Sequence, residues 1–322
     1  MRRSVLLGTG SALPRRALGN EELARMVDTS DEWIVERTGI RNRYVAGDDE
    51  TTSSLATEAC RKAIEAAGIE AETIDLIVLA TATPDQTFPA TATIVQDALG
   101  CNGGIAFDVA AVCSGFLYAL AVADSMLRSG MANRALVIGS ETFSRILDWE
   151  DRSTCVLFGN GDGAIVIEAQ EDGAAEPRGI LATRLHADGA HNQLLYVDGG
   201  VSSTQTTGVL KMEGREIFKH AVQKLAQTAE SALEKAGVSA ADVDWIVPHQ
   251  ANLRIITATA QKMGVPMDRV VVTVQDHGNT SAASIPLAMS VGKARGQIKE
   301  GELLVAEAIG GGLAWGSVVL RW

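Results

Sequence analysis

The sequence predicts an α/β protein with two similar halves, each containing a parallel-rich sheet that helices cover on both faces. Two observations lead to this prediction. Residues 63–78 (AIEAAGIEAETIDLIV) and 232–247 (ALEKAGVSAADVDWIV) are identical at eight of sixteen positions. Each half also carries an alanine-rich apolar helix, at residues 115–128 and 282–295, which an apolar strand follows.

Each copy of the repeat has the pattern of a helix end, a glycine cap and a buried strand. Gly68 and Gly237 follow the helical stretches, and the strands read LIVLATAT in the first copy and WIVPH in the second. Any α/β protein shows helix, glycine and strand several times, so this pattern alone leaves a chance similarity open.

The elements that follow each copy favour a duplication. The stretch DVAAVCSGFLYALAVADSMLRSG leads into the strand RALVIGS, and DHGNTSAASIPLAMSVGKARGQ leads into ELLVAEAIGG. Strand, loop, apolar helix and strand in this order are typical of crossovers in a parallel sheet buried on both faces. The connector-like stretch QEDGAAEPRG then divides the chain into halves at 1–174 and 175–322.

The two alanine-rich helices are apolar around most of their circumference, which is typical of helices inside a protein. Cys113 stands at the start of the first helix, and Asn279 stands just before the second. Approximate two-fold symmetry between the halves would place these two residues opposite one another at the centre of the molecule.

Composition and charge exclude several classes of protein. The 322 residues are 46% hydrophobic and 21% charged, as in globular proteins, and the net charge of −12 argues against sequence-independent nucleic-acid binding. No apolar run reaches the length of a membrane span, and Gly8 interrupts the N-terminal apolar run too early for a signal peptide. The four scattered cysteines form no CxxC pair. We expect a cytoplasmic protein with reduced thiols, no metal and no membrane partner.

Cys113 is the candidate nucleophile. A thiol at a helix N-terminus lies near the positive end of the helix dipole, which favours the reactive thiolate. The alternative is a buried structural cysteine, which is the commoner fate of a free cysteine. Cys60, Cys101 and Cys155 lack a comparable setting, and we interpret them as structural.

His249 and Asn279 are the candidate partners of this cysteine. His249 follows the strand in WIVPHQAN, and the carboxyl end of such a strand usually borders a ligand-binding crevice. Asn279 lies in the turn-like stretch HGNTSAAS. Taken singly, His249 could be a core residue and Asn279 a helix cap.

Together these stretches resemble the β-ketoacyl-acyl carrier protein synthase III family. The resemblance rests on Cys113, PHQAN, HGNTSAAS, the terminal GGGLAWG and the early TSDEWIVERTGIRNR, and so extends over essentially the whole chain. It implies a thiolase-like fold with a layered αβαβα core. Chalcone-synthase-type enzymes are similar in the Cys, His, Asn combination, whereas elongating ketoacyl synthases carry a second histidine in place of Asn279.

The resemblance implies a role for each residue. Cys113 would take the acyl group of an acyl-CoA as a thioester. His249 and Asn279 would donate hydrogen bonds to the enolate that forms when a malonyl thioester loses CO2. The amides of Cys113 and Gly311 would form an oxyanion hole, because a glycine run lets the main chain approach closely. The alternative for that run is a glycine-rich turn before the last strand.

Acyl-CoA is expected as a substrate, and no cofactor is expected. By resemblance, the adenine of CoA would lie between Trp33 and Arg152, because an indole and a guanidinium each offer a flat face to a purine. The remaining CoA contacts implied by the resemblance are Arg37 for a phosphate and Met212, Gly214 and Asn252 for the pantetheine arm.

Carrier-protein and dimer contacts are also implied. An acyl carrier protein is acidic, so an acidic enzyme needs a local positive patch, for which Lys219, Arg254 and Lys262 are candidates at the tunnel mouth. Scattered surface charge is the alternative. Phe88 resembles a residue that this family inserts across a homodimer interface into the acyl pocket. Ile309 stands where many members have phenylalanine, which leaves rate and acyl preference open.

The predicted reaction is the decarboxylating Claisen condensation of an acyl-CoA, with acetyl-CoA as the expected primer, and malonyl-acyl carrier protein. This reaction initiates type II fatty acid synthesis. A related condensing or acyl-transferring enzyme of secondary metabolism is the nearest alternative, and a noncatalytic carrier-protein or nucleotide binder is another. A dinucleotide-dependent oxidoreductase is disfavoured, because GTGSAL lacks the third glycine and the acidic residue of that fingerprint.

Overall fold

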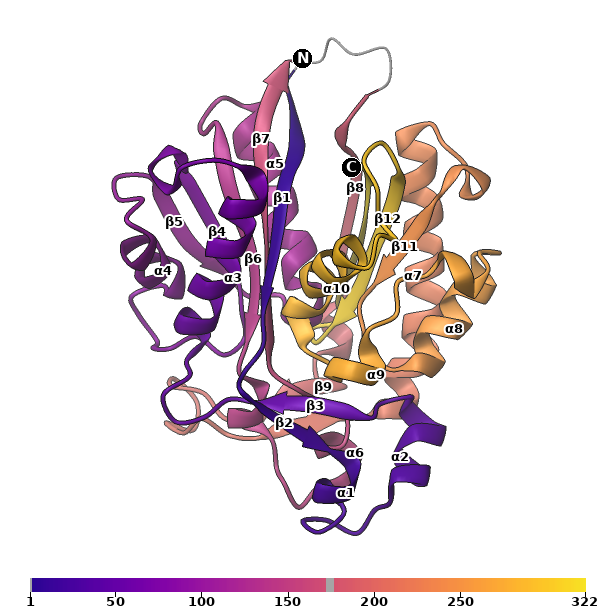
Figure 1. Cartoon of the computed structure of the whole chain (residues 1–322). Coiled ribbons are helices and arrows are strands. Elements are labelled where there is room, and N and C mark those ends of the chain that lie inside the picture. The colour runs from indigo at the N-terminus through magenta and orange to yellow at the C-terminus, as the bar shows by residue number, and fades with distance from the viewer. Residues whose placement is uncertain (1, 172–176) are drawn as a thin grey trace.

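The computed structural model describes residues 2–171 and 177–322 and contains two main sheets. They lie beside one another with helices between and outside them (Figure 1). In spatial order, the first sheet consists of β1 (Arg2–Ala12), β7 (Gly161–Glu171), β6 (Arg134–Glu141), β4 (Leu76–Ala80) and β5 (Ile105–Val109). The second consists of β8 (Gly179–Ala187), β13 (Ala314–Arg321), β12 (Leu303–Gly310) and β11 (Trp245–Pro248).

The two sheets repeat one topology. In the first, β4 is parallel to β6, and β7 is antiparallel to both β6 and β1. In the second, β11 is parallel to β12, and β13 is antiparallel to both β12 and β8. Where the first sheet has β5, the second shows a single parallel bridge between Ile246 and Val270. The predicted duplication is confirmed, while its boundary at 174/175 lies outside the described residues.

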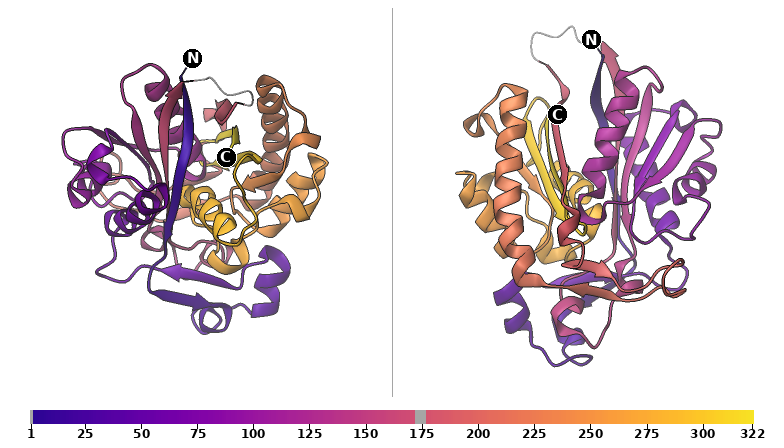
Figure 2. Two further views of the ribbon diagram at one scale, coloured as in Figure 1. Left: turned by 45° about the horizontal axis from the view of Figure 1, so that its top comes forward. Right: turned by 180° about the vertical axis from the view of Figure 1, so that it is seen from behind.

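Helices complete a five-layered αβαβα arrangement. Two helices, α5 (Gly115–Arg128) and α10 (Ser284–Ala294), lie between the sheets and pack in the largest apolar cluster (Figure 2). The outer face of the first sheet is covered by α3 (Thr52–Ala67) and α4 (Thr91–Leu99). The outer face of the second is covered by α7 (Gly214–Ala236) and α8 (Leu253–Lys262). The first turns of both central helices are buried, as their apolar circumference predicts, whereas Arg128 and Ala294 at their far ends are exposed.

The repeated helix ends follow the predicted glycine caps. α3 ends at Gly68 with φ +65°, and α7 ends at Gly237 with φ +73°. Glycine occupies this left-handed conformation without a steric penalty, so each chain turns directly toward the next strand. All five residues of β4 are buried.

Several of the smaller elements lie below the carboxyl ends of β4 and β6 (Figure 1). No helix in residues 2–171 and 177–322 is long and apolar enough to cross a lipid bilayer. The smaller elements are β2 (Arg16–Gly19), α1 (Asn20–Leu23), α2 (Asp31–Thr38), β3 (Asn42–Val45), η1 (Ala71–Thr73), η2 (Val112–Ser114), η3 (Phe143–Ile146), α6 (Arg152–Cys155), η4 (Gly189–His191), β9 (Leu195–Val197), β10 (Leu210–Met212), η5 (Ala240–Asp242), η6 (Met267–Arg269), α9 (Val274–His277) and η7 (Ser281–Ala283).

The halves meet where the two central helices begin. A 3-10 turn precedes each helix, η2 before α5 and η7 before α10, and the two turns contact one another. Each turn starts with a residue in the left-handed region, Val112 at φ 47° and Ser281 at φ 49°. Such a conformation costs about 1–2 kcal/mol for an L-residue, so the surrounding structure must hold it. By position in these turns, Cys113 corresponds to Ala282.

Close packing at this junction requires glycine at position 139. A β-carbon added there would lie 2.2 Å from the carbonyl oxygen of Ala282. We expect Gly139→Ala to lower the free energy of unfolding, measured by urea denaturation, by about 1–3 kcal/mol, because backbone must shift. Gly189→Ala is the matched control, since no atom lies within 4 Å of its added β-carbon. Equal losses in both variants would contradict this explanation.

Candidate active site

A cavity of about 620 Å³ lies where the halves meet, and both halves line it. Cys113, His249 and Asn279 all border this one cavity. The structure thus brings together three residues that are far apart in the sequence. The remaining lining residues are Trp33, Arg37, Ser153, Leu157, Phe158, Leu195, Met212, Gly214, Arg215, Ile217, Phe218, Lys219, Ala251, Asn252, Arg254, Ile255 and Ile309.

Cys113 occupies the middle of η2, immediately before α5, with 3% of its surface exposed. Burial raises the pKa of Cys113 to about 12, although a hydrogen bond with Ser281 partly offsets this. The resting group is therefore a neutral thiol. The predicted thiolate is not supported, because the cost of burying a charge outweighs the expected benefit of the helix N-terminus. Attack on a thioester must then include removal of the thiol proton.

His249 directly follows β11, as the sequence predicts, and is 5% exposed. Its Nδ1 lies 2.6 Å from the hydroxyl oxygen of Ser284, which also accepts the Gln250 N–H at 3.3 Å. With its oxygen accepting that amide, the Ser284 hydroxyl can donate its proton to Nδ1, leaving Nε2–H as the free donor. Burial lowers the pKa of His249 to about 3, so the ring is neutral.

Asn279 is fixed by its backbone and its side chain. Its N–H donates to the Leu157 carbonyl at 2.9 Å, and its carbonyl accepts from the Gly159 N–H at 2.9 Å. The side-chain Oδ1 accepts from the Ser281 N–H at 2.9 Å. This bond leaves the Nδ2 amide group as a hydrogen-bond donor. His249 and Asn279 thus provide two neutral donors in a cavity that also contains a thiol.

The glycine run after β12 approaches the nucleophile closely. A β-carbon on Gly310 would lie 2.6 Å from the Cys113 nitrogen, and one on Gly311 would lie 2.6 Å from the Leu195 carbonyl oxygen. Only glycine permits both approaches without movement of the backbone. Gly311 is not one of the cavity-lining residues, and its predicted place in an oxyanion hole stays a prediction. Ile309 borders the cavity and is 6% exposed.

Most residues predicted to contact CoA surround the same cavity. Trp33, Arg37, Met212, Gly214 and Asn252 line it. Asn252 also caps α8, because its Oδ1 accepts the N–H of the third residue of that helix. The Asn252 amide group therefore keeps its donors for a ligand.

Arg152 does not line the cavity but stacks on Trp33, which does. Its guanidinium carbon lies 4.8 Å from the centre of the indole ring, and that of Arg37 lies 4.5 Å away. Direct stacking leaves no space for a purine between indole and guanidinium. If adenine binds there, at least one arginine must move aside.

The predicted carrier-protein contacts divide into two places. Lys219 and Arg254 line the cavity. Lys262 instead ends α8 and borders a separate groove between α7 and α8, and its predicted contact with the carrier protein stays a prediction. Phe88 does not line the cavity either, and 82% of its surface is exposed.

Sequence reasoning missed most of the apolar wall and several polar contacts. Phe158 and Leu195 border the cavity, and Phe158 stacks on Phe143 with the ring centres 5.1 Å apart. No pattern in the sequence predicts that these residues lie near Cys113. Ser281 and Ser284, by contrast, lie within the stretch HGNTSAAS. Two hydroxyl side chains in a turn next to Asn279 could have been predicted to form hydrogen bonds with the site residues.

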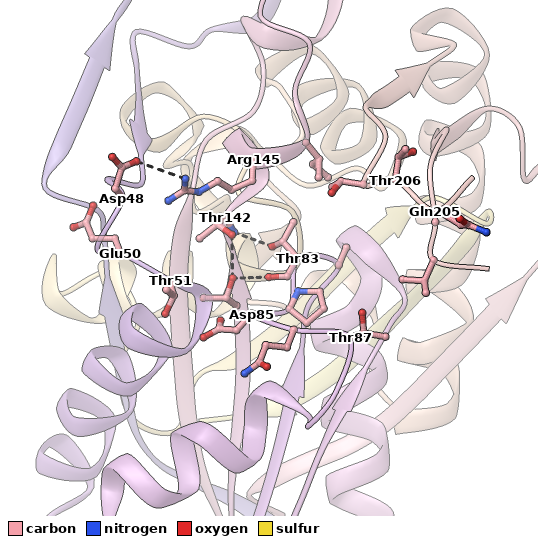
Figure 3. A pocket seen from close by; sticks show the side chains of 18 residues that line it. Asp48, Glu50, Thr51, Thr83, Asp85, Thr87, Thr142, Arg145, Gln205 and Thr206 are labelled. Carbon is pink, nitrogen blue, oxygen red and sulfur yellow. Dashed lines mark hydrogen bonds and ion pairs between the residues drawn. The ribbon is translucent and has the colours of Figure 1, made fainter. Parts of the chain in front are cut away.

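A larger cavity of about 1,120 Å³ lies elsewhere (Figure 3). Threonine and acidic side chains dominate its lining, including Thr51, Asp85 and Thr142. No cysteine or histidine lines it. We therefore assign the chemistry to the smaller cavity, which contains the thiol and both neutral donors.

The repeated five-layered fold, with its reactive groups at the junction of the halves, defines the thiolase-like condensing enzymes. A family model described as 3-oxoacyl-[acyl-carrier-protein (ACP)] synthase III matches residues 107–189, and its C-terminal counterpart matches residues 233–322. The β-ketoacyl-[acyl-carrier-protein] synthase III of Rhizorhabdus wittichii is 68% identical over 322 residues, 100% of both chains. This chain belongs to the β-ketoacyl-[acyl-carrier-protein] synthase III family.

Solved structures agree with this assignment. The crystal structure of 3-oxoacyl-[acyl-carrier-protein] synthase III from Aquifex aeolicus has a TM-score of 0.93 and 47% identity, and the match covers 99% of this chain and 100% of that one. The priming β-ketosynthase of the R1128 polyketide biosynthetic pathway has a TM-score of 0.92 and 36% identity, with 99% and 96% covered. The predicted thiolase-like fold and condensing-enzyme class are confirmed.

Proposed function

We propose that this chain joins the acyl group of an acyl-CoA to the malonyl unit of malonyl-acyl carrier protein, with loss of CO2. The products are 3-oxoacyl-acyl carrier protein and CoA, and the reaction initiates type II fatty acid synthesis. One observation supports the proposal most directly: a single cavity contains the buried Cys113 thiol and the two buried neutral donors of His249 and Asn279. The names of the relatives support the same reaction.

The first half-reaction is acyl transfer. Cys113 attacks the thioester carbonyl of acyl-CoA, and backbone N–H groups beside Gly310 stabilise the oxyanion that forms. CoA then leaves, and the acyl group stays on Cys113 as a thioester. The thioester keeps its reactivity toward carbon nucleophiles because water has little access to so buried a site.

The second half-reaction is decarboxylation and condensation. When the malonyl thioester loses CO2, negative charge collects on its carbonyl oxygen, and His249 and Asn279 donate hydrogen bonds to that oxygen. A neutral imidazole suits this role, and burial keeps His249 neutral. The enolate carbon then attacks the acyl-Cys113 carbonyl, which forms the new carbon–carbon bond and frees the Cys113 sulfur.

Acetyl-CoA is the primer that we propose. The apolar wall beside Cys113 contains Phe158, whose ring stacks on Phe143. Two stacked aromatic rings form a stiff wall, which favours a short acyl group. Ile309 completes the wall near His249 with an aliphatic side chain.

A homodimer and a carrier-protein surface belong to the same proposal. Phe88 is 82% exposed, and β5 is an edge strand on which Ile105 is 37% exposed. Exposed apolar side chains at a sheet edge suit a second copy of the chain. Lys219 and Arg254 line the cavity and would attract an acidic carrier protein there, despite the net charge of −12. We place the enzyme in the cytoplasm.

Single-turnover labelling tests the function. After incubation with acetyl-CoA, mass spectrometry should show one added acetyl group on the peptide that contains Cys113. Adding malonyl-acyl carrier protein should then remove this group and yield 3-oxobutyryl-acyl carrier protein. Absence of an adduct on Cys113, or an adduct that the malonyl donor does not discharge, would count against the proposal. A product on a different carrier would favour the secondary-metabolism alternative that the priming β-ketosynthase suggests.

A further inference from the structure

A buried carboxyl group lies beside the nucleophile. Glu141 ends β6 and has 0% of its surface exposed. Its Oε2 accepts hydrogen bonds from the Thr83 hydroxyl at 2.7 Å, the Ala82 N–H at 3.1 Å and the Thr81 hydroxyl at 3.3 Å. Its Oε1 accepts from the Ser281 hydroxyl at 3.0 Å. Four donors directed at one carboxyl group favour its ionised form.

Ser281 connects this carboxyl group with the nucleophile. Its hydroxyl donates to Glu141 Oε1 at 3.0 Å, and a hydrogen bond between the Ser281 and Cys113 side chains counteracts the effect of burial on the pKa of the thiol. The residue is held in the left-handed region at φ 49°, and its N–H donates to Asn279 Oδ1. The Ser281 backbone is thus fixed, and its hydroxyl can receive a proton from the sulfur while it donates its own to the carboxyl oxygen, as a proton relay requires.

Burial and hydrogen bonding act in opposite directions on Glu141 and leave it able to gain and lose a proton near neutrality. Burial raises the pKa of Glu141 to about 7, against the effect of its hydrogen-bond donors. Two titratable groups interact with it, Cys113 from η2 and Asp162 from β7. Burial raises the pKa of Asp162 well above its usual range, and the Asp162 carboxyl accepts a hydrogen bond from Ser140. Burial thus favours the neutral forms of Asp162 and Cys113, whereas the donors around Glu141 favour its ionised form.

We propose that Glu141, acting through Ser281, takes the proton of Cys113 during acyl transfer and returns it after condensation. This inference rests on the proposed function. Glu141 touches neither the sulfur nor the substrate, so it is a positioning residue that holds the proton in the interior.

Each proton and each bond in the two half-reactions is accounted for over one turnover. As Sγ of Cys113 forms its bond to the acyl carbon, the thiol proton moves to the Ser281 oxygen, and the Ser281 proton moves to Glu141. The bond between the acyl carbon and the CoA sulfur breaks, and CoA leaves as a thiolate that takes a proton from solvent. Decarboxylation yields the enolate, condensation frees Cys113 as a thiolate, and Glu141 returns its proton through Ser281. One proton from solvent is consumed, as the overall reaction requires.

His249 is less suited to accept this proton. Its Nδ1 is hydrogen-bonded to Ser284, and burial lowers the pKa of the ring to about 3. A proton taken by so weak a base would return to the sulfur before the carbon–sulfur bond is complete. Transfer of the thiol proton to Glu141 also leaves His249 neutral, as its role toward the enolate requires.

The pH dependence of Cys113 reactivity tests the relay. In the wild-type protein, the rate of Cys113 alkylation by iodoacetamide should rise with pH and level off above about 7, because Glu141 must be ionised to act as a base. In Glu141→Gln and Ser281→Ala, the rate should rise about tenfold per pH unit between pH 6 and 9, without levelling. At pH 7.5 both variants should react at least about tenfold more slowly than wild type.

Glu307→Gln is the matched control. Glu307 is 1% exposed, and burial raises its pKa to about 8, but no hydrogen bond connects its side chain with Cys113. This variant should keep the plateau above pH 7. In the enzymatic assay, the ratio of acetyl transfer to malonyl decarboxylation should fall at least about tenfold in Glu141→Gln and Ser281→Ala only.

The outcomes separate the relay from the proposed function. A plateau that persists in Glu141→Gln and Ser281→Ala would overturn the relay, as would its loss in Glu307→Gln as well. Should Glu141→Gln fail to fold, Ser281→Ala, which removes a single oxygen, decides alone. Failure of the wild-type protein to accept an acetyl group would overturn the proposed function. The pH dependence of Cys113 alkylation would still test the relay in that case.

Discussion

A Cys113→Ala variant should form no acyl-enzyme and no 3-oxoacyl product, yet it should still decarboxylate malonyl-acyl carrier protein. The reason is the division of the site: the thiol is needed only for the acyl group, whereas the two donors act on the enolate. Intact-protein mass spectrometry and release of labelled CO2 measure the two steps separately. Condensation should fall below detection, the largest effect that we expect from one substitution.

Cys101→Ala is the control for this experiment. Cys101 is a free, buried cysteine that does not line the cavity. The control variant should therefore accept one acetyl group and complete the condensation. An acyl adduct in Cys113→Ala would identify a different nucleophile and contradict the assignment.

Replacement of Asn279 by alanine should slow malonyl decarboxylation by about 100- to 1,000-fold, the usual loss when one oxyanion donor is removed. The expected loss is large because the Asn279 amide is held by the Ser281 N–H and by backbone contacts with residues 157–159. Acetyl transfer to Cys113 should fall far less, since the enolate does not form in that step. Release of CO2 from malonyl-acyl carrier protein measures the first rate, and single-turnover acetylation measures the second.

Asn279→Asp provides a sharper version of this test. A carboxylate has nearly the same shape as the amide, but it would repel the developing enolate and cannot donate when ionised. Decarboxylation should therefore be at least as slow as in the alanine variant. If the aspartate variant retained wild-type decarboxylation, Asn279 could not be acting as a hydrogen-bond donor.

Much of the fold could be predicted from the sequence, because equivalent positions in the two halves still carry identical residues. The repeat around Gly68 and Gly237 located two equivalent helix ends, and both glycines cap helices in the left-handed conformation. The sequence did not show that the second sheet lacks a counterpart of β5. A single parallel bridge at Val270 replaces that strand, and no sequence pattern distinguishes a bridge from a short strand.

Sequence motifs identified the reactive residues, but the protonation state of Cys113 depends on its burial in the folded protein. The helix N-terminus suggested a thiolate at Cys113, whereas burial raises the pKa of this thiol to about 12. Burial is a tertiary property that local sequence does not report. Lys262 lies roughly 12 Å along α8 from Arg254, at 1.5 Å per helical residue, and borders a different groove, which the sequence did not indicate. Glu141 ends an apolar strand, and its contact with Ser281 spans 140 residues.

The equivalence of Cys113 and Ala282 in the two turns has a consequence for how such enzymes can diversify. Only one half supplies the sulfur, and the other supplies the imidazole and the carboxamide. The acyl wall, however, contains Phe158 from the first half and Leu195 and Ile309 from the second. A hybrid gene that combines the amino-terminal part of one relative with the carboxyl-terminal part of another would therefore change the acyl pocket as well as the contact between the central helices.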